Sequence, residues 1–383
     1  MVLETQTQAP PLSRSRLRHL RIVHLVASLE IGGLERLVVD LAAEQRRSGH
    51  DVAICCLYQL GPFSSDAEAA GIPVTCFHKT DGVSPATFFR LARKLRQSAP
   101  DVVHTHNSLV HHYGALAAKL AGVPVVINTR HGLSRVNPEA KAERIFRATL
   151  PFTSAVAMVS GSTQQSLVDR CRIPREKSTV ILNGISVERF AARRARPGSA
   201  LPRIRFGTVG RLDPIKDHLT LLRAFAIVAA QLPEAELSIA GDGPELPALR
   251  GMIAEASLGS RVTLAGAIDD SPGFLSSLDV FVLSSLSEGL PVVILEAMAS
   301  GLPIVSTRVG GTPEVAPENV VAWYCPPASP DDLARTMLHV ARHVDLGAAG
   351  EQACRIAQQR FSIAATAAGY EECYRSFLPR PRS

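Results

Sequence analysis

Short apolar strands alternate with amphipathic helices along much of this chain, and this alternation constrains the fold more than any other feature. It begins with the β-branched run 20–27, which a loop follows. Apolar side chains then recur at positions 34, 37, 38, 41 and 42, which share one face of a helix. A second strand is predicted at 51–57. A strand, a helix and a strand in this order make a βαβ unit, in which the two strands pair in parallel.

The alternation runs to about residue 182, stops, and starts again at residue 204. In the first half, further strands are predicted at 72–77, 101–104, 124–128, 155–160 and 178–182, with helices at 85–98 and 111–120. In the second half, strands are predicted at 204–210, 235–240, 261–265, 280–283 and 303–306, with helices at 217–232, 245–256, 271–277, 292–300, 331–342 and 350–377. The pattern predicts an α/β protein of two doubly wound, Rossmann-like domains that face a central cleft, with ligands beyond the carboxyl ends of the strands.

The length of 383 residues exceeds what one hydrophobic core usually organises, which agrees with two domains. Residues 189–202 contain Pro, Gly and Ser without apolar periodicity, which is typical of a linker. The predicted segments are a polar N-terminal extension at 1–19, a first domain at 20–188, the linker at 189–202, a second domain at 203–360, and a C-terminal helix at 361–383 that has the option of crossing back to the first domain.

Composition argues against several classes of protein. Aromatic residues make up only 5% of the chain, which argues against base-stacking modules, so no nucleic-acid partner is expected. No run of 18 uncharged apolar residues occurs and the first 20 residues are polar, so neither a membrane-spanning helix nor a secretory signal is expected. The seven cysteines form no CxxC pair, which favours reduced thiols and a cytoplasmic location.

Charge is distributed unevenly between the two halves. Residues 1–196 carry 26 Lys and Arg against 15 Asp and Glu, a net charge of +11, whereas residues 197–383 carry 15 against 20, a net charge of −5. The basic first half favours an anionic partner, such as a diphosphate-linked acceptor or the inner face of an anionic membrane. A solvated surface that is merely basic is the alternative, and the sequence leaves both open.

Glycine-rich turns follow two of the predicted strands. Gly32 and Gly33 come after the first strand and before a helix, where they let backbone amides approach an anion, although a simple tight turn is an equal alternative. Gly241 and Gly243 come after the strand 235–240. There a turn with a helix cap and a backbone approach to a nucleotide are both open.

Two cations flank a third turn, Gly210-Arg211-Leu-Asp-Pro-Ile-Lys216. Asp217 is expected to cap the helix that follows. Cations and free helix amides that converge on one loop suit a diphosphate, because charge-assisted hydrogen bonds are short and strong. A solvated basic loop is the alternative.

Two carboxylates lie eight positions apart in the segment Glu288-Gly-Leu-Pro-Val-Val-Ile-Leu-Glu296. A proline at the start of the predicted helix preorganises its first turn, so Val292 and Val293 present unpaired amides toward the strand ends. A carboxylate accepts hydrogen bonds from vicinal hydroxyls, as in recognition of sugar and ribose. The segment therefore predicts a site for a polar, hydroxyl-rich ligand.

Together these motifs resemble the retaining, nucleotide-sugar-dependent glycosyltransferases of family 4, which have the GT-B fold. The resemblance extends from about residue 20 to 375, and the run EAMASGLPIVST is its most specific part. The opening SLEIGGLERLVVDLA is similar to sugar transferases of bacterial exopolysaccharide clusters.

The resemblance implies roles for individual residues. Glu288 contacts hydroxyls of the transferred hexose, and Glu296 contacts those of the nucleotide ribose. His131, after the strand 124–128, reaches the sugar near its anomeric centre, with a loop histidine that has no such role as the alternative. The groups implied to bind the nucleotide and its diphosphate are cations and backbone amides: Arg211, Lys216, Gly32, Gly33, Gly210, Gly241, Gly243, Val292 and Val293.

The resemblance also implies an activity. A hexosyl unit passes from a nucleoside diphosphate sugar to a glycan or a polyprenyl-diphosphate-linked acceptor, with retention at the anomeric carbon and in polysaccharide biosynthesis. The first domain binds the acceptor and the second binds the donor. No metal or other cofactor is expected, because Arg, Lys and helix amides stabilise the leaving diphosphate.

Several alternatives are less well supported. His104, His106, His111 and His112 lack the spacing and the accompanying Cys or Glu of a zinc site, so we expect a strand-end loop that borders the acceptor pocket. A nucleotide-sugar epimerase and an inactive donor-binding regulator remain open. No segment matches the cofactor lysine of a pyridoxal phosphorylase. Neither half has the GxGxxG turn of a dinucleotide oxidoreductase.

Overall fold

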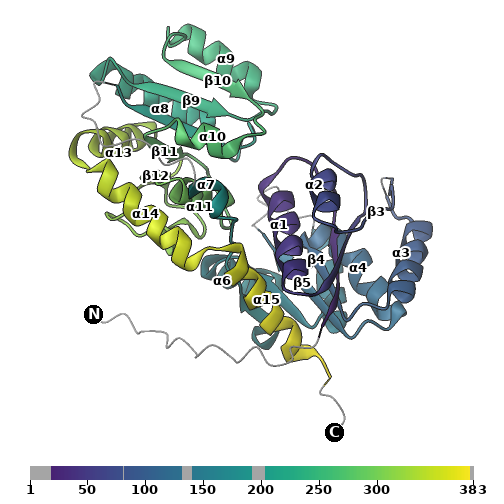
Figure 1. Cartoon of the computed structure of the whole chain (residues 1–383). Helices are drawn as coiled ribbons and strands as arrows, with labels where there is room; N and C mark the ends of the chain where they lie inside the picture. Colours follow the sequence, from purple (N-terminus) through teal and green to yellow (C-terminus); the bar gives the residue numbers. More distant parts are fainter. Residues whose placement is uncertain (1–18, 81, 132–139, 192–202, 380–383) are drawn as a thin grey trace.

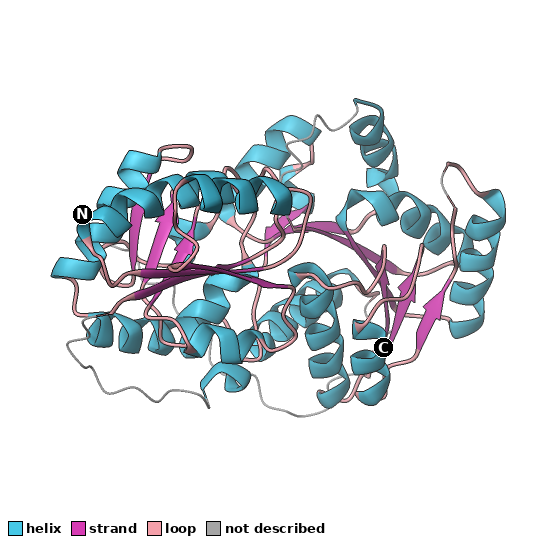
Figure 2. Cartoon of the chain, turned by 90° about the horizontal axis from the view of Figure 1, so that it is seen from above, coloured by secondary structure: helices cyan, strands magenta, loops and turns pink. Residues whose placement is uncertain are grey.

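A computed structural model describes residues 19–80, 82–131, 140–191 and 203–379. Most of the predicted N-terminal extension and linker lie outside these ranges. In the described part, two parallel sheets form two lobes, and helices cover both faces of each sheet (Figures 1 and 2). The prediction of two doubly wound α/β domains is confirmed.

The first sheet has seven parallel strands in the order β3-β2-β1-β4-β5-β6-β7. Its strands are β1 (Arg21–Val26), β2 (Asp51–Cys56), β3 (Val74–Cys76), β4 (Val102–His106), β5 (Val125–Arg130), β6 (Ala155–Met158) and β7 (Ser178–Val180). The helices between them are α1 (Gly33–Arg47), α2 (Phe63–Ala69), α3 (Pro85–Ser98), α4 (Asn107–Ala121), α5 (Ala140–Thr149) and α6 (Gly161–Cys171), and α7 (Glu188–Ala191) follows. The order of strands reverses between β1 and β4, the position at which ligands bind in such sheets.

The second sheet has six parallel strands in the order β10-β9-β8-β11-β12-β13. Its strands are β8 (Arg205–Val209), β9 (Glu236–Ala240), β10 (Val262–Gly266), β11 (Val280–Leu283), β12 (Ile304–Thr307) and β13 (Ala322–Cys325). Its helices are α8 (His218–Gln231), α9 (Leu246–Glu255), α10 (Ser271–Ser276), α11 (Val292–Ala299), α12 (Thr312–Val315), α13 (Pro330–His343) and α14 (Leu346–Arg360). Here the order reverses between β8 and β11, so the predicted donor motifs follow the strands at the reversal.

Local sequence explains where the helices near these strand ends begin. Asp217 adopts a left-handed conformation with φ of 49°, and its side chain accepts a hydrogen bond from the amide of Thr220, so it caps α8 as predicted. In α1, Leu37, Val38 and Leu41 are buried, as the helical spacing of apolar residues predicts.

The single helix predicted at 350–377 is wrong, because the chain breaks between α14 and α15 (Ile363–Phe377). Ser362 caps α15, and the backbone on either side of it pairs with Ile185: Ile185 donates to the carbonyl of Phe361 at 2.9 Å, and Ile363 donates to the carbonyl of Ile185 at 2.8 Å. The helix α15 then packs on the first domain, where Tyr370 and Tyr374 join its core, and Figure 1 shows α14 and α15 on different lobes. Within the described ranges, every helix is too short or too polar to span a bilayer.

Candidate active site

The loop after β8 holds the two predicted cations, and the loop after β9 supports it. Gly241 and Gly243 have φ of 144° and 159°, which side chains rarely adopt. A Cβ on Gly241 would lie 1.8 Å from the carbonyl oxygen of Gly210, and one on Gly243 would lie 2.3 Å from that of Leu212. Both positions therefore require glycine, because the backbone of this loop lies directly against the backbone of the loop that carries the two cations. The two glycines thus support the cation-bearing loop through packing.

Lys216 and Glu288 meet at the centre of the second-domain loops. Lys216 Nζ lies 2.7 Å from Glu288 Oε1, and Ser285 donates to the same oxygen at 2.6 Å. Two further bonds join their loops, from Ser284 Oγ to the carbonyl of Lys216 and from the amide of Leu286 to the carbonyl of Ile215, both at 2.8 Å. The cation and the carboxylate are thus held in a preorganised pair at the sheet's reversal point.

Arg211 is not part of this pair. Its side chain is 74% exposed, and its nearest carboxylate, that of Asp213, lies 3.9 Å from Nε. A contact of this kind between exposed groups holds the side chain only weakly. The loop therefore presents one fixed cation, Lys216, and one that is free to move.

The N-termini of two helices, one from each domain, meet next to these residues. Gly33 is the first residue of α1 and Val292 is the first residue of α11. A Cβ on Gly33 would lie 3.7 Å from Cβ of Val292, so the two ends are in contact range. The first amides of a helix lack helical partners and carry partial positive charge, so this junction can bind an anion.

Glu296 lies one turn further along α11 and is half-buried. Ser271 Oγ donates to its Oε2 at 3.3 Å. Burial raises the pKa of Glu296 to about 7, and the positive charge of Arg189 opposes that rise. Its carboxyl group therefore titrates close to neutral pH.

His131 comes directly after β5 in the first domain and is half-buried. Its amide donates to Asn107 Oδ1 at 3.2 Å, and its Nε2 lies 3.1 Å from His106 Nδ1. Burial lowers the pKa of His131 to about 3, so its ring is neutral at neutral pH.

Side chains from both domains also join the lobes next to this region. The carboxylate of Glu314, in α12, accepts hydrogen bonds from the amides of Gly161 at 2.7 Å and Ser162 at 2.8 Å, at the N-terminus of α6. Asn183 Nδ2 donates to the carbonyl of Leu290 at 3.2 Å. A carboxylate from one domain thus caps a helix of the other.

Comparison with known proteins identifies the family. Residues 31–189 match the model of Glycosyltransferase Family 4, and residues 203–343 match that of Glycosyl transferases group 1. The chain is 29% identical over 287 residues to the putative glycosyltransferase EpsF of Bacillus subtilis, covering 71% of this chain and 74% of EpsF. This protein is a family 4 glycosyltransferase.

A second relative of this glycosyltransferase is an Escherichia coli enzyme named UDP-Gal:alpha-D-GlcNAc-diphosphoundecaprenol alpha-1,3-galactosyltransferase. The two are 28% identical over 299 residues, which cover 73% of this chain and 76% of the relative. Among solved structures, that of Anabaena HepE in complex with UDP matches with a TM-score of 0.80 at 22% identity, covering 93% of this chain and all of that one. The predicted GT-B fold is confirmed.

In the glycosyltransferase, some predicted site residues lie together and others do not. Lys216 and Glu288 are in direct contact, and Gly33 and Val292 bring the two helix tips together. Arg211 instead extends into solvent. Sequence reasoning missed Ser285 and Glu314, because a serine and an acid in loops carry no local signal of the partner that each one contacts.

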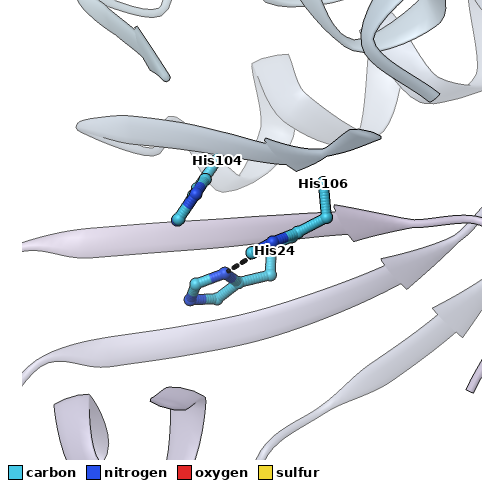
Figure 3. A group of neighbouring side chains, drawn as sticks. All are labelled: His24, His104 and His106. Carbon is cyan, nitrogen blue, oxygen red and sulfur yellow. Dashed lines mark hydrogen bonds between the residues drawn. The ribbon is translucent and has the colours of Figure 1, made fainter. Parts of the chain in front are cut away.

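The expectation that His104, His106, His111 and His112 lie in a strand-end loop is wrong. His104 and His106 are inside β4 and buried, because the strand continues to residue 106, and His111 and His112 are on α4. One nitrogen from each of His24, His104 and His106 lies within 4.8 Å of the others, and Figure 3 shows the three rings grouped between neighbouring strands. A metal ion bound there would have to replace hydrogen bonds, since both ring nitrogens of His24 and of His104 already have partners.

Proposed function

We propose that this glycosyltransferase moves a hexosyl unit from a nucleoside diphosphate sugar to a glycan or polyprenyl-diphosphate-linked acceptor, with retention and without a metal ion. The observation that carries the proposal is the Lys216–Glu288 pair, a cation and a carboxylate held together near two helix N-termini. That combination suits a ligand with a diphosphate joined to a hydroxyl-rich ring.

The diphosphate is the part of the donor on which charge develops during transfer. Lys216 and the amides of Val292 and Val293 stabilise this charge, and Arg211 turns toward the diphosphate from its exposed position. The N-terminus of α1 at Gly33 adds a contact from the first domain. These groups supply the positive charge that a divalent cation would supply in a metal-dependent enzyme, which supports metal independence. HepE, whose fold is shared, has been crystallised with UDP-glucose.

The two carboxyl groups bind the hydroxyls on either side of the diphosphate. Glu288 is fixed by Lys216 and Ser285 and accepts from the hexose hydroxyls. Glu296 accepts from the ribose hydroxyls. Transfer then proceeds with attack on the face from which the phosphate leaves, assisted by the leaving phosphate, and closure of the domains excludes water.

The first domain supplies a surface for a lipid-linked acceptor. The helices α3 and α4 pack against each other and expose Phe89, Leu109, Leu116 and Leu120. Arg93, Lys94 and Arg96 are exposed on α3. Apolar and cationic side chains on neighbouring helices favour peripheral contact with an anionic membrane at its cytoplasmic face. The undecaprenol-linked acceptor in the name of the E. coli relative supports this assignment.

The test is a panel of nucleotide sugars, first ranked by thermal shift and then assayed for transfer to synthetic polyprenyl-diphosphate-linked sugars, with EDTA present. We expect nucleoside diphosphate release only when acceptor is present, and NMR of the product to show the anomeric configuration of the donor. Donor isomerisation without acceptor would indicate an epimerase, and binding without turnover a regulator. Either result, or loss of activity in EDTA that Mg²⁺ restores, would contradict the corresponding part of the proposal.

A further inference from the structure

A continuous chain of hydrogen bonds runs from His131 through the core of the first domain. His131 Nε2 lies 3.1 Å from His106 Nδ1, and His106 Nε2 lies 3.0 Å from His24 Nδ1. His24 Nε2 lies 2.7 Å from Gln45 Oε1, and Gln45 Nε2 donates to the hydroxyl of Tyr374 at 3.3 Å. The chain then continues through three more side chains: His104, Thr129 and Tyr370.

This chain connects elements that are far apart in the sequence. His24 lies on β1 in register with His104 on β4, Gln45 lies near the end of α1, and Tyr374 lies on α15. His24, His106 and Gln45 are at most 3% exposed. Buried polar atoms need partners within the protein, so the donors and acceptors along the chain must alternate in a consistent order.

The amide of Gln45 sets the direction of that order. Its Oε1 carries no hydrogen, so His24 donates to it from Nε2. A neutral imidazole has one ring proton, so His24 Nδ1 is bare and accepts from Nε2 of His106. By the same rule His106 Nδ1 accepts from Nε2 of His131. The proton of His131 is therefore on Nε2, and its lone pair is on Nδ1.

We propose that Gln45, His24 and His106 are positioning residues that hold His131 as the Nε2–H tautomer, so that Nδ1 of His131 accepts a hydrogen bond from a hydroxyl of the sugar. The inference rests on the proposed function and on the role that the family resemblance implies for His131, which is contact with the donor sugar. Among the described residues, Nδ1 of His131 has no hydrogen-bond partner, which leaves it available. A carboxylate of a sugar at this position has no hydrogen to donate and would be repelled by the lone pair on Nδ1 of His131. This tautomer therefore favours a sugar hydroxyl at this position over a carboxylate.

The order requires every ring in it to stay neutral, because a protonated ring has two donors and no acceptor. Burial lowers the pKa of His24 to about 4 and that of His131 to about 3. Burial also holds the pKa of His104 and of His106 well below the usual range. All four rings are thus neutral at neutral pH.

The first experiment reads the tautomers directly. The full chain is labelled with ¹⁵N-histidine, and long-range ¹H–¹⁵N spectra at pH 7.5 distinguish a protonated ring nitrogen from a bare one. Single substitutions assign the signals. We expect Nε2–H for His24, His106 and His131 alike. A protonated Nδ1 on His131, which is the reverse order with the Gln45 amide turned over, would overturn the proposal.

The second experiment breaks the order at one point. His24→Leu removes the partner of His106, whereas His24→Asn retains an oxygen able to accept from it. The matched control is His111→Leu, because His111 is equally buried in the same domain but bonds to Thr105 and Thr153, outside the chain. We expect His24→Leu to mix the tautomers of His131 and to lower kcat by about 10- to 100-fold for the active donor, a loss similar to that seen when a group that orients a metal-bound histidine is removed. His24→Asn should keep most of the kcat of the unsubstituted protein. His111→Leu should change neither kcat nor the tautomer of His131.

Equal loss of kcat in His24→Leu and His111→Leu, with no change in the tautomer of His131, would reduce the chain to a structural role and overturn the proposal. Stoichiometric zinc in the purified full chain, with ¹⁵N shifts of His24, His104 and His106 typical of metal-bound rings, would do the same. The spectra require no donor, so the tautomer order can fail while transfer activity stands. Transfer can equally fail while the order is observed, which separates this inference from the proposed function.

Discussion

The two domains carry their polar site groups in different ways. In the second domain, charged side chains sit on short loops after the strands, and Lys216 and Glu288 meet directly. In the first domain, the polar groups lie inside the sheet and are neutral, with His24 and His104 side by side on β1 and β4. The exposed Arg211 can move toward a ligand from its loop, whereas the buried neutral network holds its side chains in one geometry. The comparison supports the proposal that the second domain binds the diphosphate of the donor, and that His131 of the first domain contacts its sugar.

Removal of a second-domain cation should have the largest effect. Lys216→Ala and Arg211→Ala should each lower kcat by about 10²–10³-fold if each contacts the leaving diphosphate in the transition state. Steady-state kinetics with the active donor measure the change. Arg335→Ala is the control, because Arg335 is an exposed cation on α13 of the same domain. Unchanged kcat in both Lys216→Ala and Arg211→Ala would show that these second-domain cations do not act in the transfer step.

Acidification should affect the first domain before the second. Five described histidines in the first domain have a lowered pKa, against one, His218, in the second; the five are His24, His104, His106, His111 and His131. Below about pH 6.5 these histidines bind protons in the unfolded state but stay neutral in the folded state. The free energy of unfolding is therefore highest above about pH 6.5 and decreases as the pH falls toward 4. For His24 alone the loss is about 3 kcal/mol. Hydrogen exchange at pH 7 and pH 5 should show β1 and β4 losing protection first, and earlier loss in β8 and β11 would contradict the comparison.

A substitution that disturbs the packing of the glycine-containing loop after β9 should have a smaller effect on function than the loss of a cation. Gly241→Ala places a Cβ against the carbonyl of Gly210 at a φ of 144°, which should cost about 1–3 kcal/mol of unfolding free energy and weaken donor binding. Gly251→Ala is the control, since Gly251 lies in α9 with no atom near its Cβ position. That variant should be neutral or slightly more stable. Chemical denaturation and donor titration measure both effects, and equal stability in the two variants would argue against the loop contact.

The smallest expected effect concerns Glu296. Because the pKa of Glu296 is about 7, its side chain ionises as the pH rises through neutrality. The ionised carboxylate is the better acceptor for ribose hydroxyls. Donor affinity should therefore improve several-fold from pH 6 to pH 8, roughly in line with one ionisation. Calorimetric titration across this range measures the slope. In Glu296→Gln the slope should vanish, and its persistence would assign the titration to another group.

Local sequence patterns pointed to the candidate groups of the second domain more readily than to the buried network of the first. The motif around Lys216 and that from Glu288 to Glu296 each lie within nine residues, so their spacing alone indicates chemistry. The buried network was not predictable, because His24, Gln45 and His106 meet only once β1, α1 and β4 have packed. The strand at β4 also ended two residues later than predicted, which moved His106 from an expected loop into the core. The helix predicted at 350–377 ran through Ser362, although the predicted domain boundary falls at 360–361, because the break depends on a pairing with Ile185, far away in the sequence.

The decisive measurement is a crystal structure of the full chain with its active nucleotide sugar. We expect the diphosphate between Lys216 Nζ and the N-terminus of α11, hexose hydroxyls on Glu288, and a hydroxyl within hydrogen-bonding distance of His131 Nδ1. A donor bound elsewhere, with the Lys216–Glu288 pair intact and no phosphate near Val292, would contradict it.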